Sequence, residues 1–377
     1  MTVINAVYVH IPFCSSKCGY CSFNSYSGLE DLFQVYTGAL RADIHRSAGI
    51  VTAKKITSVY FGGGTPYHWG AGRLAQTLRL IRQVWDVDGA AEISLEANPG
   101  SLGTDGLAIL RKAGFNRISI GAQSFSDRCL ALAGRRHRSI DIARGVKAAR
   151  QAGFQNLSLD LIYGLPEQSI EQWRKDLEQA VNLEPNHIST YGLTLEPPTA
   201  LWRAVKDGRL NVADDDLQAD MYGQGSSLLE RSGYPFYELS SFAPDGYECR
   251  HNLNYWRMGG YVGVGAGAHS YVGSSRYWKE ASPEMYIKAL LAGGNGAEGS
   301  EYLSSEQLAG DEVMLSLRLR EGLDVERFAS KYGPGFLEDR SGSIAELIGL
   351  DLLAPGRRLA LTEKGRLLAN EVMQTFV

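Results

Sequence analysis

Hydrophobic and polar residues form two alternating patterns along the first half of the chain. Short runs rich in β-branched residues predict strands, and longer segments with apolar residues every three to four positions predict amphipathic helices. The expected strands are Ala6–Ile11, Ile56–Phe61, Glu92–Glu96, Arg117–Gly121, Leu157–Ile162 and His187–Leu193. The expected helices are Leu29–Ile50, Gly72–Trp85, Thr104–Ala113, Ile140–Ala152 and Ser169–Asn182.

Repeated strand–helix units of this kind predict an α/β fold with parallel strands joined by crossover helices. Eight such units would close a barrel. The six units seen here leave it open, so we expect a partial (β/α)6, three-quarter TIM-like barrel with a lateral gap. Ligands of such sheets bind at the carboxyl ends of the strands.

The alternation of predicted strands and helices ends after Leu195, and two further regions follow. An acidic helix start, Asp214-Asp215-Asp216, precedes an expected helix at Leu217–Ser232 and a stretch rich in aromatic residues and glycine. From Ser304 onward, helical segments and a hairpin at residues 353–362 predict a winged-helix-like domain. We therefore expect a barrel at 1–200, a small α+β segment that closes it at 201–303, and a C-terminal helical domain at 304–377.

Composition and charge narrow the classes of partner. The 377 residues are 44% hydrophobic and 21% charged, with a net charge of −4 and no long basic run. These values argue against nucleic acid as a partner, so a docking role suits the winged-helix-like domain better than DNA binding. The chain shows neither a signal-peptide pattern nor an apolar stretch long enough to span a bilayer, so we expect a cytoplasmic protein.

Cys14, Cys18 and Cys21 form a C-x3-C-x2-C motif directly after the first expected strand. Three thiolates can hold three irons of a [4Fe-4S] cluster and leave the fourth iron open to a small molecule. Zinc is the alternative, but it normally takes four ligands in two close pairs, and no second pair stands nearby. Such thiolates require a reducing compartment. Of the two isolated cysteines, Cys129 is expected to be a small buried residue.

Polar residues and glycines follow several strands. The run Gly62-Gly63-Gly64-Thr65 brings backbone amides close together and favours an anion site over an ordinary tight turn. Glu96 and Gln123 come at the ends of the third and fourth strands. Asp160 lies inside an apolar strand, where a carboxylate needs a partner, and Arg135 is a candidate for it or for a ligand carboxylate.

The cysteine spacing resembles that of the radical S-adenosylmethionine (SAM) superfamily. Together with the strand-end motifs, the chain is similar over nearly its whole length to the oxygen-independent coproporphyrinogen III oxidase family. The motifs that carry this resemblance are YVHIPFC at 8–14, FGGGTP at 61–66, EANPG at 96–100, GAQSF at 121–125 and DLIYGLP at 160–166. The resemblance implies a [4Fe-4S] cluster on the three cysteines. It also implies contacts with the cluster-bound SAM at Tyr8, Gly63, Gly64, Thr65 and Glu96. Positions that the oxidase uses around a second SAM correspond to Tyr20, Gln123, Arg135 and Asp160.

Two departures from the oxidase resemble its haem chaperone branch, the HemW type. Phe23 stands where the oxidase has a further cysteine, and the chain begins close to its first strand, without the oxidase's N-terminal extension. The motif His251–Trp256 also fits the H-N-x-x-Y-W pattern of that branch, which implies haem contacts at His251, Asn252, Tyr255 and Trp256.

Imidazole is a common haem ligand, and aromatic rings pack well on a macrocycle. The motif does not settle which side chain ligates the iron, and His269 and Cys249 are rival candidates. The glycine-rich stretch 259–269 offers a backbone surface against which a flat ligand could lie.

Three functional hypotheses follow from these features. The first is a haem chaperone that carries haem to a haem-requiring acceptor, such as a respiratory protein, with SAM cleavage left open. The second is oxidative decarboxylation of coproporphyrinogen III by a 5′-deoxyadenosyl radical, and the third is a radical SAM C-methyltransferase or cyclopropanase. The expected cofactors are the [4Fe-4S] cluster and SAM, with haem as cargo. A homodimer and a peripheral membrane contact through a partner stay open.

Overall fold

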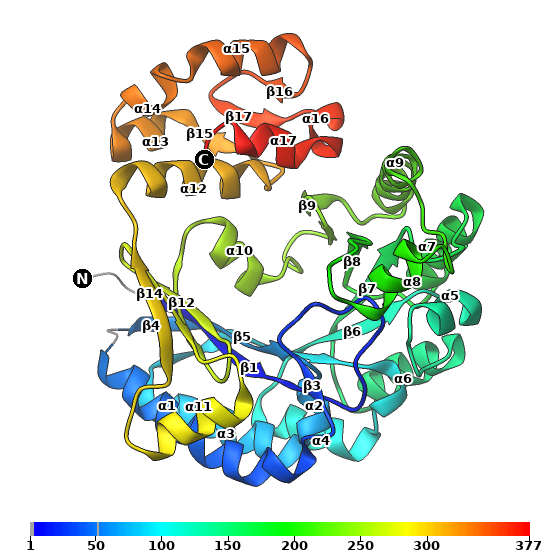
Figure 1. Cartoon of the computed structure of the whole chain (residues 1–377), viewed down its shortest axis with the longest axis vertical. Coiled ribbons are helices and arrows are strands. Elements are labelled where there is room, and N and C mark those ends of the chain that lie inside the picture. The colour runs from blue at the N-terminus through cyan, green and yellow to red at the C-terminus, as the bar shows by residue number, and fades with distance from the viewer. Residues whose placement is uncertain (1–3, 51–52) are drawn as a thin grey trace.

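The computed structural model describes residues 4–50 and 53–377. Six parallel strands form the centre of the molecule, in the order in which they occur in the chain (Figure 1). All six predicted strands are confirmed, most with slightly longer bounds. They are β1 (Ile4–Ile11), β4 (Ala53–Gly63), β5 (Val87–Ala97), β6 (Arg117–Gln123), β7 (Asn156–Tyr163) and β8 (His187–Gly192).

Helices cover one side of this sheet, and apolar residues between the two layers form the main core. All five predicted helices are present, because their apolar stripes pack on the strands. They are α1 (Phe33–Ile50), α3 (Ala71–Val84), α4 (Thr104–Ala113), α6 (Ser139–Gln151) and α7 (Ile170–Asn182). The short helices α2 (Pro66–Trp69), α5 (Asp127–Leu132) and α8 (Ala200–Lys206) were not predicted. Cys129, on α5, is buried as expected.

The segment after the sixth strand extends both edges of the same sheet. Strands β9 (Phe236–Glu238) and β10 (Ser241–Phe242) join the β8 edge. At the β1 edge lie β11 (Gly260–Val264), β12 (His269–Val272), β13 (Ser275–Lys279) and β14 (Ala297–Tyr302). No strand pairing joins β8 to β1 in the described residues, so the expected three-quarter barrel is open on one side. The helices of this segment are α9 (Asp215–Arg231), α10 (Arg250–Trp256) and α11 (Pro283–Leu291).

The C-terminal domain has a hydrophobic core of its own, above the barrel in Figure 1. Its helices and hairpin match the predicted winged-helix-like layout. Its helices are α12 (Ser305–Leu317), α13 (Val325–Tyr332), α14 (Gly335–Glu338), α15 (Ser341–Gly349), α16 (Glu363–Leu367) and α17 (Ala369–Gln374). Its strands are β15 (Leu323–Asp324), β16 (Leu353–Ala354) and β17 (Arg358–Leu361). Across residues 4–50 and 53–377, none of the helices has the length and apolarity needed to cross a membrane.

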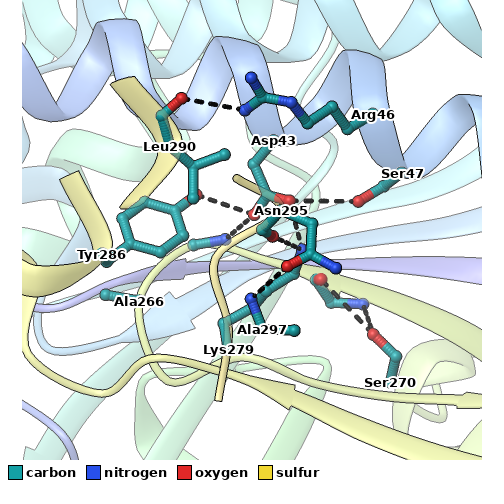
Figure 2. A network of polar contacts seen from close by, with 12 residues as sticks. Asp43, Arg46, Ser47, Ala266, Ser270, Lys279, Tyr286, Leu290, Asn295 and Ala297 are labelled. Carbon is teal, nitrogen blue, oxygen red and sulfur yellow. Dashed lines mark hydrogen bonds and ion pairs between the residues drawn. The ribbon is translucent and has the colours of Figure 1, made fainter. Parts of the chain in front are cut away.

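A buried ion pair fixes the β11–β14 extension to the helical layer (Figure 2). Lys279, on β13, donates to Asp43, on α1, at 2.6 Å, and both side chains are almost fully buried. Tyr286 and Ser47 also donate to this carboxylate, at 2.8 and 3.2 Å. A buried charge needs such partners, so the network holds the extension in one position.

The glycine-rich stretch 259–269 packs against protein and does not form the exposed ligand surface suggested above. A Cβ atom at Gly263 would lie 2.1 Å from the backbone oxygen of His269, and one at Gly265 would lie 2.3 Å from that of His10. These glycines therefore let β11 approach β1 and the turn before β12 closely.

Candidate functional site

The three motif cysteines lie on one loop at the carboxyl end of β1. The short strands β2 (Phe13–Cys14) and β3 (Tyr26–Ser27) pair in parallel and close the base of this loop. Each cysteine sulfur lies near a side-chain hydrogen-bond donor, which is an arrangement that tunes iron–sulfur sites. The contacts join Cys14 to Thr65 (3.5 Å), Cys18 to Arg135 (3.3 Å) and Cys21 to Ser25 (3.7 Å).

A cavity of about 460 Å³ opens beside these sulfurs and runs into the barrel. Its wall includes the three cysteines and eight of the nine residues expected to contact SAM. These eight are Tyr20, Gly63, Gly64, Thr65, Glu96, Gln123, Arg135 and Asp160. The ninth, Tyr8, is not part of the lining, and its hydroxyl bonds to Nδ1 of His10 at 3.0 Å. The sequence motifs thus converge on one cavity.

The glycines after β4 allow its backbone to pass close to neighbouring groups. Gly63 has a φ of 113°, and a Cβ there would lie 2.7 Å from the ring of His10. A Cβ at Gly64 would lie 2.7 Å from the backbone oxygen of Phe13. Only glycine fits both positions. The expected anion site on these amides is wrong, because the amides of Gly63, Gly64 and Thr65 already donate to Glu96, the Ile11 carbonyl and the Phe13 carbonyl.

Two carboxyl groups with partial exposure lie in the cavity wall. Glu96 accepts hydrogen bonds from the Tyr60 hydroxyl (2.9 Å) and the Gly63 amide (3.3 Å). Burial raises its pKa to about 7. Asp160 accepts from the Ser119 hydroxyl at 2.8 Å, and burial also raises its pKa. Both groups can accept hydroxyl or amine donors from a ligand.

Arg135 is not the partner of Asp160, in contrast to one sequence-based expectation. Its Nη1 donates to Cys18, and its Nη2 donates to Asn98 and to the Gly121 carbonyl, both at 2.8 Å. Its Nε is buried without a hydrogen-bond partner among the described atoms. Asp160 instead takes hydrogen bonds from serines, which are small enough to fit inside the barrel.

The residues around the cavity fit the cluster and SAM that the family resemblance implies. Three sulfurs with nearby donors suit a [4Fe-4S] cluster, and the unpartnered Nε of Arg135 beside them leaves a donor for a bound group. The carboxyl groups and this guanidinium around one cavity suit the amino-acid and ribose parts of SAM. A bound cluster of this type would supply the electron that cleaves SAM. Cys14, Cys18 and Cys21 would hold the cluster.

The H-N-x-x-Y-W motif forms α10, and its residues face in different directions. Asn252 lines the same cavity as the SAM residues. His251 is 1% exposed, and its two ring nitrogens bond to the Ser58 hydroxyl (3.0 Å) and the Tyr255 hydroxyl (2.7 Å). Burial lowers the pKa of His251 to about 3, so the ring is neutral near pH 7.

The remaining motif residue and the rival thiol also have partners inside the protein. The guanidinium carbon of Arg318 lies 4.4 Å from the centroid of the Trp256 ring, at the junction with the C-terminal domain. Cys249 is 1% exposed, and its thiol lies 3.7 Å from Glu92. Burial raises the pKa of Cys249 to about 12. In this conformation the Cys249 thiol reaches no exposed surface for a macrocycle, whereas Trp256 is partly exposed.

Several cavity residues were not singled out from the sequence. Tyr60 and Arg117 point into the barrel between the apolar residues of β4 and β6. Their alternation with buried apolar neighbours is a signal that could have identified them. Asn98 stands in the same quoted motif as Glu96, but only the structure shows it holding Arg135.

Comparisons with known proteins agree with this geometry. The Radical SAM superfamily model matches residues 8–180, and the HemN C-terminal domain model matches residues 303–368. Escherichia coli coproporphyrinogen III oxidase (HemN), a radical SAM enzyme, superposes with a TM-score of 0.88 and 25% identity, covering 99% of this chain and 90% of that one.

Curated relatives are similar over almost the full length. Heme chaperone HemW of Mycobacterium tuberculosis is 37% identical, with 98% of this chain and 94% of the relative covered. Heme chaperone HemW of Bacillus subtilis is 33% identical, with 99% of both covered. On these grounds the chain belongs to the radical SAM superfamily and, within it, to the HemW family.

Proposed function

We propose that this protein is a haem chaperone, which binds haem and passes it to a haem-requiring acceptor while carrying a SAM-binding [4Fe-4S] cluster. The observation that carries the proposal is similarity over almost the whole chain, including the C-terminal domain, to proteins named Heme chaperone HemW.

The cavity explains how the chain's residues would prepare such a site. The three cysteines would hold the cluster, Glu96 would contact the SAM bound to it, and Asp160 and Arg135 would lie at the positions of a second SAM. The α10 motif supports the haem region from within: Asn252 faces the cavity, and the buried His251 fixes the helix through its bonds to Ser58 and Tyr255. This division of roles explains how the histidine of a haem-binding motif can be buried.

The proposal extends to partners and compartment. An acceptor such as a respiratory haem protein would dock on the C-terminal domain or at the open side, with any membrane contact made by that acceptor. A reducing compartment such as the cytoplasm suits the free thiols. A homodimer is compatible with this role.

An anaerobic absorption titration of the cluster-loaded protein with haemin tests the proposal. We expect saturable 1:1 binding with a shifted Soret band, transfer of the haem to an apo haem protein, and little 5′-deoxyadenosine formed from SAM. Rapid SAM cleavage without haem binding would contradict the proposal. Formation of protoporphyrinogen from coproporphyrinogen III would instead identify a decarboxylase.

A further inference from the structure

The structure distinguishes among the histidines that could ligate haem iron. The chain has seven histidines. Five of the rings bond to protein groups, namely His10, His68, His137, His187 and His251. Within the described part of the chain, His45 and His269 are exposed and their rings have no hydrogen-bond partner. His45 lies on α1, in the helical layer outside the sheet.

His269 lies at the start of β12. The turn that precedes it packs on the end of β1, because a Cβ at Gly265 would lie 2.3 Å from the backbone oxygen of His10. The ring of His10 in turn packs on the Gly63 turn, which lines the cavity. Asn24 on the cluster loop donates to the Ala266 carbonyl at 3.1 Å, which joins that loop to the turn before β12.

The two faces of the β12–β13 pair have different roles. Ser270 and Lys279 face the buried network, as Figure 2 shows. His269 pairs with Trp278 across the two strands, so both side chains lie on the opposite face. Their rings stack with centroids 5.8 Å apart and an angle of 23° between planes.

Trp278 has room to lie flat because the next strand carries Gly299 opposite it. A Cβ at Gly299 would lie 2.4 Å from the indole ring. The stacked indole fixes the plane of the His269 imidazole and leaves its nitrogen edge free. An axial ligand needs this geometry, since the iron lies in the plane of the imidazole and the macrocycle lies across its edge.

Phe23 is an exposed apolar side chain on the cluster loop. Phe23 is 70% exposed and lines the mouth of the cavity. It is the chain neighbour of Asn24, whose side chain contacts the turn before His269. A large exposed aromatic ring on a loop that contacts the turn before His269 suits a flat apolar ligand.

We propose that His269 is the axial ligand of haem in this protein, with Trp278 as the residue that orients it and Phe23 as an apolar contact. The inference rests on the proposed haem-binding function and adds the ligand to it. It places the haem iron on the face of β12–β13 beside the cluster loop, and it gives the buried His251 a supporting role.

Chemical rescue tests this assignment. Cluster-loaded wild-type protein, His269→Gly and the matched surface control His45→Gly are titrated anaerobically with haemin, with and without free imidazole. We expect His269→Gly to bind haemin at least tenfold more weakly with a displaced Soret band, and imidazole to restore the band. His45→Gly is expected to match the wild type. His269→Gln, which keeps a polar side chain without the imidazole, is expected to show the same loss.

The possible failures are distinguishable. Wild-type binding with an unchanged Soret band and affinity in both His269 variants would overturn the ligand assignment and leave the haem chaperone proposal standing. Absence of haemin binding by the wild type would overturn both. Weaker binding by His269→Gly that imidazole does not restore would also contradict ligation by this ring.

Discussion

Two regions bring a histidine and a tryptophan close to the concave side of the barrel, and they differ in what those side chains do. On α10, His251 is buried with both nitrogens bonded, and Trp256 packs under Arg318. On β12–β13, His269 is exposed and stacks on Trp278. Similar residues therefore stabilise structure in one region and remain accessible to a ligand in the other.

The difference teaches that a motif associated with a ligand need not contain the atoms that contact it. The spacing of His251 and Tyr255 puts both on one side of a helical turn, where they bond to each other. On β12–β13, the strand pairing holds an imidazole against an indole while leaving its edge in solvent. Substitutions in the two regions should therefore change different measured properties.

The largest expected effect comes from the buried ion pair beneath the β12–β13 face. Lys279→Met leaves the Asp43 carboxylate buried without its cation, which should lower the free energy of unfolding by about 3–5 kcal/mol. Urea denaturation measures this change. The control Arg257→Ala breaks an exposed pair with Glu321, whose loss should cost no more than about 1 kcal/mol. Equal effects of the two variants would show that the network does not support the face.

The second prediction concerns the pH dependence of stability at α10. Burial lowers the pKa of His251 to about 3, so between roughly pH 6.5 and 3 the unfolded chain binds a proton that the folded chain does not. Stability is therefore lost as the pH falls through this range, by up to about 1.4 kcal/mol per pH unit from this group. His251→Asn should make the dependence less steep near pH 5.

Matched unfolding experiments at several pH values check this prediction. His269→Asn is the control, because this side chain is exposed and its ring makes no hydrogen bond within the described residues. A slope that changed in the His269 variant and not in the His251 variant would reverse the comparison.

The smallest expected effect concerns the junction between α10 and the C-terminal domain. The contact of Arg318 with the Trp256 ring should contribute about 0.5–2 kcal/mol. A double-mutant cycle with Trp256→Leu and Arg318→Gln measures this coupling free energy. A coupling near zero would mean that the tryptophan does not hold the domain in place.

Sequence patterns predicted the fold well where apolar periodicity was strong. The parallel strand β1 reads as a largely apolar run because most of its residues are buried. In β7, leucines alternate with Ser158 and Asp160, and Asp160 lines the cavity. The stretch 259–269 was harder to interpret, since its glycines serve contacts between backbones that only the folded chain reveals. The extension of the sheet by β11–β14 was missed for the same reason.

The candidate site was predicted in part. Strand-end motifs placed Glu96 and Gln123 on the cavity wall, because parallel strands align their carboxyl ends at one edge. The predicted pairing of Arg135 with Asp160 was wrong, because Arg135 donates to Asn98 and Asp160 accepts from Ser119. A sequence pattern does not show which side chains are close enough to bond across a barrel. The burial of His251 was not predicted either, because a short motif does not say which side of its helix faces the core.

The most direct test of the account is the Soret spectrum of two variants measured side by side. Anaerobic haemin titrations of His269→Ala and His251→Ala separate ligation from support. The account predicts a displaced Soret band and weak binding in His269→Ala, and an unmoved band with at most reduced affinity in His251→Ala. A displaced band in His251→Ala together with a wild-type spectrum in His269→Ala would contradict it.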